Sequence, residues 1–207
     1  MTEARGRRKS GGGRSARQAS RAADTIQAPA FITRQLNPFE VLDEAGLELI
    51  ERNADTILEE IGIDFRDEPE ALSILKAAGA SVDGERVRFP RGMCRQIIQA
   101  SAPSTYTQHA RNSDRNVDIG GKNTVFAPGY GSPFVRDLDN GRRYATINDF
   151  QNFVKLAYMS PYMHHSGGTI CEPVDVPVTT RHLDMIYSHI KYSDKAFMGS
   201  VTAPSRA

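Results

Sequence analysis

The chain has 207 residues, of which 39 % are hydrophobic and 25 % charged, and its formal net charge is +1. This composition is ordinary for a globular protein and excludes fibrous, collagen-like and wholly disordered chains. No uncharged apolar stretch approaches the roughly 18 residues of a membrane-spanning helix, so we expect a cytoplasmic protein without a membrane segment. Cys94 and Cys171 belong to no CxxC or Cys/His cluster, so the sequence predicts free thiols and no metal site.

The N-terminal segment is strongly basic. Seven of residues 1–23 are arginine or lysine, against one acidic residue, Glu3. Because this segment is rich in Gly and Ser and nearly devoid of apolar side chains, we expect residues 1–36 to form a disordered leader. Its charge would suit RNA or an acidic partner, but so short a charge run favours a solvated leader, and we predict no nucleic-acid partner.

Residues 37–102 are predicted to form a small helical cap. Its first helix begins after the capping residue Asp43 and ends at Gly62, with apolar side chains spaced three and four apart on one face. These are Leu47, Ile50, Ala54, Ile57, Leu58 and Ile61. Two further helices, at about 68–78 and 91–100, flank a short strand at 86–89. Since no paired carboxylates or phosphate-binding glycines occur here, we expect this cap to serve packing or oligomer contact.

Residues 103–207 have a different pattern, with short alternating segments at 104–109, 116–119 and 124–127 that predict strands. The next two strand-like runs, 134–138 and 142–145, enclose the turn Asp139-Asn140-Gly141. Asn-Gly between two such runs is a strong hairpin signal, because both turn residues tolerate positive φ.

The rest of the chain alternates helix and strand. Thr146 and Asp149 resemble a capping box that opens a helix through Tyr158, and a strand ending at His164-His165 is expected next. Thr179 or Thr180 is predicted to cap another helix, followed by a strand at 196–201. This order predicts parallel βα units, and hence an α/β fold in which 103–207 is the first part of an incomplete TIM (β/α)₈ barrel, since closure needs about 250 residues.

Several motifs in order resemble the trimethylamine methyltransferase (MttB) family from about Asn37 onward, with the basic leader outside the resemblance. They are Ile57–Ile63, Gly79–Asp83, Val87–Pro90, Ala102-Pro103, Ala110–Asn112, Phe126–Pro133, Asp137–Arg143, Thr146 and Asp149. The resemblance implies a TIM barrel enzyme about twice this length or more. It also implies transfer of a methyl group from a tertiary or quaternary amine, such as trimethylamine or glycine betaine, to the cobalt of a corrinoid.

In that family the corrinoid is carried by a separate partner protein, so the resemblance implies no cofactor bound directly by this chain and a homo-oligomer in full length. Some members contain pyrrolysine at a position beyond Ala207, and family size favours the type without it. We expect the catalytic residues to lie beyond 207 and residues 1–207 alone to be inactive. The alternative is a non-catalytic binding or assembly module with an open three-stranded α/β sheet.

The candidate substrate-binding residues lie at predicted strand ends. The loop Gly129-Tyr130-Gly131 follows the strand 124–127, and its glycines would let the backbone approach a ligand closely, although a plain turn explains them equally well. Alternation sends His164 and His165 to opposite faces, so at most one of them points into the barrel mouth. Aromatic faces attract cationic amines. The candidates are Tyr130, Phe134, Tyr158 and Tyr162, with a core role favoured for Phe134 and Tyr158.

Overall fold

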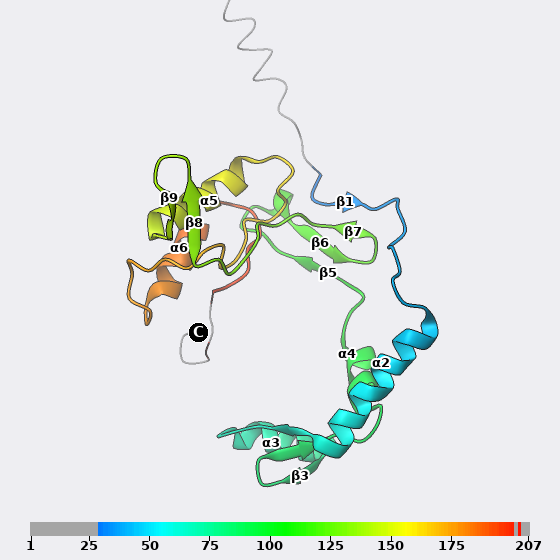
Figure 1. The fold of residues 1–207 in the computed structure, drawn as a ribbon. Helices are drawn as coiled ribbons and strands as arrows, with labels where there is room; N and C mark the ends of the chain where they lie inside the picture. Colours follow the sequence, from blue (N-terminus) through cyan, green and yellow to red (C-terminus); the bar gives the residue numbers. More distant parts are fainter. Residues whose placement is uncertain (1–28, 201–202, 204–207) are drawn as a thin grey trace, which may run out of the picture. The chain divides into compact units, whose positions relative to one another are not determined.

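The computed structural model describes residues 29–200 and residue 203. Most of the predicted leader, residues 1–28, and the end of the predicted last strand therefore lie outside the described residues. The fold is mixed α/β and divides into two compact units, one of residues 35–104 and one of residues 29–34 with 105–200 (Figure 1). Within the described part of the chain, no helix is both long and apolar enough to cross a membrane.

The first unit opens with helix α2 (Glu44–Thr56), which the sequence predicted correctly. The Asp43 carboxylate caps it by accepting a hydrogen bond from the Gly46 amide at 2.9 Å. A π-helical turn, η1 (Ile57–Ile61), extends the helix to Gly62. Of the apolar face that the spacing indicated, Leu58 packs against the core of the unit. Other members of that face are more than half exposed in this chain: Leu47, Ile50, Ile57 and Ile61.

The remaining helices of this unit, α3 (Pro69–Ala77) and α4 (Met93–Ser101), also lie where they were predicted. The sequence indicated one strand in this unit, whereas the structure has a three-stranded antiparallel sheet of order β2-β4-β3, in which β2 precedes α3 and the other two strands lie between α3 and α4. Its strands are β2 (Ile63–Asp64), β3 (Ser81–Asp83) and β4 (Arg86–Arg88). The predicted strand at 86–89 corresponds to β4, whereas β2 and β3 were not predicted, because strands of two or three residues are too short to produce a visible alternation.

The second unit contains an antiparallel sheet of order β1-β7-β6-β5. Its strands are β1 (Ile32–Thr33), β7 (Asn123–Thr124), β6 (Val117–Gly120) and β5 (Thr105–Gln108). Two predictions need correction. Ile32–Thr33 pairs with Asn123–Thr124, although the leader was expected to be disordered as far as residue 36. The predicted strand 124–127 is also only partly a strand. The structure has strand β7 at Asn123–Thr124, which pairs with β6 in an antiparallel direction, and the chain leaves this sheet after Thr124.

The predicted hairpin is confirmed as strands β8 (Phe134–Asp137) and β9 (Gly141–Tyr144). Its turn differs from the expected one, since Gly141 has a φ of 65° whereas Asn140 does not adopt positive φ. The Asp137 carboxylate instead holds the turn by accepting hydrogen bonds from the amides of Asp139 and Asn140, at 3.0 and 2.6 Å.

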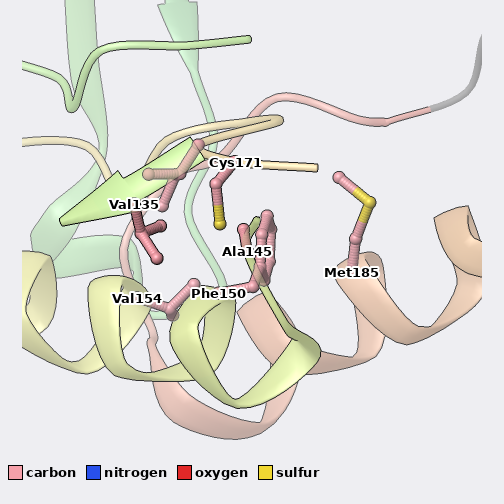
Figure 2. Close-up of a cluster of buried hydrophobic side chains, with 7 residues drawn as sticks. Val135, Ala145, Phe150, Val154, Cys171 and Met185 are labelled. Carbon is pink, nitrogen blue, oxygen red and sulfur yellow. The ribbon is translucent and has the colours of Figure 1, made fainter. Parts of the chain in front are cut away.

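Helix α5 (Ile147–Met159) begins with the predicted capping box between Thr146 and Asp149. The Asp149 carboxylate also pairs with Arg143 of β9, at 2.6 and 2.8 Å, which ties the hairpin to the helix and holds the pKa of Asp149 well below its usual range. Helix α6 (Arg181–Tyr192) starts after Thr180 as expected, but the Thr180 side chain accepts no capping hydrogen bond from the first turn. Figure 2 shows the core between these elements, formed by Val135, Ala145, Phe150, Val154, Cys171 and Met185.

Candidate functional site

Three chain segments run side by side in the second unit, at 126–131, 164–168 and 196–198. The His165 amide donates to the Phe126 carbonyl at 3.2 Å, and the Met198 amide donates to the Gly167 carbonyl at 2.9 Å. Parallel bridges join Ser132 with Cys171 and His165 with Ala196. The three segments are thus parallel neighbours, as predicted, and α5 and α6 lie between them in the sequence. They are joined by isolated bridges, whereas the sequence indicated full strands.

The loop Gly129-Tyr130-Gly131 lies at the carboxyl end of the first segment. Gly131 has a φ of 78°, and its amide donates to the Thr169 carbonyl at 2.7 Å, which joins the loop to the end of the second segment. Tyr130 is 47 % exposed, and its hydroxyl lies 3.8 Å from the sulfur of Met198 at the end of the third segment. Burial raises the pKa of Tyr130, so its ring is a neutral phenol near pH 7.

His165 is buried and fully hydrogen-bonded. Its Nδ1 accepts from the Gly167 amide at 3.0 Å, so the ring proton is assigned to Nε2, which lies 3.1 Å from the side-chain oxygen of Gln108 on β5. The Gln108 amide group in turn donates to the Phe197 carbonyl at 3.0 Å. Both ring nitrogens have partners within the protein, which makes His165 a structural histidine in this chain.

His164 differs from its neighbour. Its Nδ1 accepts from the Phe126 amide at 2.9 Å, and its ring stacks on the Phe126 ring with centroids 5.7 Å apart. Its Nε2 is buried and meets no hydrogen-bond partner among the residues that the structure describes. Burial, with a smaller effect of Lys195, lowers the pKa of His164 and favours the neutral ring. The two histidines therefore have different surroundings.

We expect His165 to make the protein acid-sensitive. Burial, aided by His189, lowers the pKa of His165 to about 4. An unfolded histidine titrates near 6.5, so the unfolded chain binds the proton first and stability falls as the pH drops below about 6.5. The loss from this residue should reach about 2 kcal/mol near pH 5.

Urea unfolding at pH 7.5 and pH 5 measures this effect. His165→Gln should show a smaller loss of stability between the two pH values than the wild type, while the matched change at an exposed histidine, His109→Gln, should leave the loss unchanged. Equal pH dependence in His165→Gln and the wild type would show that His165 does not cause it.

The other aromatic candidates either have a cationic side chain over the ring or lie away from the carboxyl ends of the three segments. Arg142 covers the Phe134 ring at 3.8 Å, and Arg115 and Lys195 lie over the Tyr158 ring at 5.4 and 6.0 Å. Tyr162 precedes the second segment and so lies toward its amino end. Among the described residues, Tyr130 is the aromatic candidate at the carboxyl ends of the three segments.

The described residues contain no group of three or more His, Cys, Asp or Glu side chains placed to hold a metal ion. Cys171 is a buried free thiol, and burial raises its pKa to about 11, which makes it a poor nucleophile. Sequence reasoning missed Met198 as a neighbour of Tyr130. It fell inside the predicted strand 196–201, and a strand by itself gives no sign of its partners.

Comparison with known proteins identifies a family and two similar proteins. A family model described as trimethylamine methyltransferase (MTTB) matches residues 10–207. The chain is 49 % identical over 174 residues to the glycine betaine methyltransferase of Desulfitobacterium hafniense (strain Y51), with 84 % of this chain and 36 % of that protein aligned. It is 29 % identical over 158 residues to the proline betaine:corrinoid methyltransferase of Eubacterium limosum, with 75 % and 32 % aligned.

The chain therefore spans about a third of the length of these two relatives. The family match starts at residue 10, so it includes most of the basic leader that the motifs had placed outside the resemblance. The motifs gave no sign of this, because the leader lacks the apolar spacing by which a folded element is recognised. With the match covering almost all of its length, the chain belongs to the trimethylamine methyltransferase (MTTB) family.

Proposed function

We propose that the protein transfers a methyl group from a quaternary or tertiary amine to the cobalt of a corrinoid carried by a partner protein. The observation that carries this proposal is the family match over residues 10–207. The names of the two relatives support it, since both are methyltransferases named for a betaine, and one name includes the corrinoid. Glycine betaine is the first substrate to test, because the relative named for it is 49 % identical.

The fold supports a barrel for the complete protein. Residues 126–131, 164–168 and 196–198 are neighbouring parallel segments separated by α5 and α6, which is the repeating unit of a TIM barrel. We propose that they begin such a barrel, with the hairpin β8-β9 as an excursion from it. In TIM barrels the active site lies at the carboxyl ends of the strands. Tyr130 and its flanking glycines lie at that end.

The chemistry is a displacement at carbon. The reduced cobalt of the partner supplies an electron pair to the methyl carbon, and the pair of the broken C–N bond stays on nitrogen, so a cationic amine leaves as a neutral one. Alignment of the methyl group and exclusion of water are what this chain would contribute, and correct orientation can supply several kcal/mol. The Tyr130 ring would hold the cation, because its face attracts a desolvated ammonium by about 0.5–2 kcal/mol.

The partners follow from this proposal. A corrinoid protein is the methyl acceptor, a small methylated amine is the donor, and the complete protein is expected to be a homo-oligomer.

Gly129 and Gly131 would let the loop backbone approach the amine. His164, whose Nε2 has no partner among the described residues, is the better polar candidate of the two histidines, since both nitrogens of His165 already have partners.

Substitution of Tyr130 in the complete protein tests the site. Tyr130→Leu should lower kcat/KM for glycine betaine about tenfold by removing the aromatic face, whereas Tyr130→Phe keeps the ring and should stay within about twofold. The matched control is Tyr106→Leu on β5, where the tyrosine is similarly exposed. Methyl transfer to a reduced corrinoid protein, followed by absorbance, provides the rate. Equal rates for Tyr130→Leu and the wild type would remove Tyr130 from the site.

A further inference from the structure

Tyr130, Gly168 and Met198 come together from three neighbouring segments, and the function proposed above uses only the first of them. The Tyr130 hydroxyl lies 3.8 Å from the Met198 sulfur, and the Met198 amide is hydrogen-bonded to the Gly167 carbonyl at 2.9 Å. Because each segment contributes the residue at its carboxyl end, the three residues form a continuous surface across the segments. We refer to them as the Tyr130–Met198 surface.

Gly168 makes this surface possible. A Cβ atom at this position would lie 3.2 Å from the Met198 Cβ and 3.8 Å from Cε1 of Tyr130. The first distance is tighter than ordinary van der Waals contact, so any side chain at 168 would push Met198 away. The backbone of Gly168 therefore lies between the aromatic ring of Tyr130 and the thioether side chain of Met198.

The two side chains of the surface are exposed. Tyr130 is 47 % and Met198 53 % exposed, so both present side-chain atoms to their surroundings. The rings of Phe134 and Tyr158 already carry arginine or lysine cations, but no such cation lies over Tyr130 among residues 29–200. The aromatic face of Tyr130 and the exposed part of the Met198 thioether chain are thus available to a ligand at this position.

The chemistry of the surface fits one kind of amine. A quaternary ammonium has no N–H to donate, and its charge is spread over methyl groups, so it is recognised by aromatic faces and polarisable contacts rather than by hydrogen bonds. We propose that Met198 is a substrate-binding residue that packs, across Gly168, with Tyr130 against the methyl groups of a quaternary ammonium. This inference rests on the proposed function and adds a residue that determines the preference for quaternary amines.

Calorimetric titration of the complete protein with glycine betaine tests it, together with kcat and KM for methyl transfer to the corrinoid partner. Met198→Ala should raise Kd and KM about fivefold and leave kcat within about twofold, because the contact is made equally before and during the reaction. Met198→Leu keeps the apolar volume without the sulfur, so its Kd and KM should lie between those of the wild type and those of Met198→Ala. Gly168→Ala should weaken binding as Met198→Ala does, since its methyl group displaces Met198.

The matched control is Met159→Ala, because Met159 is also exposed but lies at the end of α5. If the wild type binds and demethylates glycine betaine while Met198→Ala and Met159→Ala have the same Kd and KM, the role of Met198 is overturned and the proposed function stands. If the wild type neither binds nor demethylates any tertiary or quaternary amine, both are overturned.

Discussion

Lys195→Met is expected to lower the free energy of unfolding by about 3 kcal/mol, because it removes the ammonium group that donates to three carbonyl groups around the end of α5. Lys195 is 3 % exposed, and its ammonium donates to the carbonyls of Ala157, Ser160 and Met163 at 2.8, 2.8 and 2.6 Å. The Ala157 carbonyl cannot receive a helical hydrogen bond from residue 161, which is Pro161 and has no N–H. Lys195 therefore caps the carboxyl end of α5.

Burial lowers the pKa of Lys195 to about 8, so the ammonium remains the main form at pH 7 and the cap is intact there. Urea unfolding at pH 7, followed by far-ultraviolet circular dichroism, measures the loss. Lys191→Met is the matched control, since Lys191 is exposed on α6, and its effect should stay within about 0.5 kcal/mol. If the two variants unfold at the same urea concentration, Lys195 does not hold the end of α5.

Gly62→Ala should be the most damaging single change in the first unit, at about 4 kcal/mol. Gly62 ends the π-helical turn with φ 74° and ψ −172°, a backbone conformation that is essentially restricted to glycine. An added Cβ would also overlap the carbonyl oxygen of Val87 in β4. The substitution thus adds backbone strain and a clash with the central strand of the sheet β2-β4-β3.

Gly79→Ala separates these two contributions. Gly79 has a φ of 104°, but a Cβ there would meet nothing within 4 Å, so only the backbone strain of about 1–2 kcal/mol applies. Hydrogen exchange of the peptide containing β4 provides a local measurement in the complete protein. We expect much faster exchange in Gly62→Ala than in Gly79→Ala, and similar exchange in both would show that the clash with Val87 is relieved by movement elsewhere.

Features that depend on neighbouring residues could be predicted from the sequence. The Asp43 cap, the Thr146–Asp149 capping box and the hairpin at Gly141 each depend on residues within a few positions of one another. Pairings between distant residues could not be predicted. Strand β1 pairs with β7 over about ninety positions, and neither two-residue strand carries a pattern that would reveal its partner.

The candidate site shows the same limit. The Tyr130 loop was found because glycines flank an aromatic residue after a strand-like run, which is a local signal. Its neighbour Met198 comes from another segment 68 residues away, and Lys195 donates to Ser160, the residue that follows α5, across 35 positions. Pro161 has no N–H to donate to the Ala157 carbonyl, but the sequence cannot show which distant donor reaches that carbonyl.

Transfer of an isotope-labelled methyl group tests the central proposal most directly. The complete protein is mixed with its corrinoid partner in the reduced state and with glycine betaine labelled in its methyl groups. We expect labelled methylcobalt and dimethylglycine to form in equal amounts. Absence of label on the cobalt with glycine betaine, and likewise with proline betaine and trimethylamine, would contradict the assignment of a corrinoid-dependent amine methyltransferase.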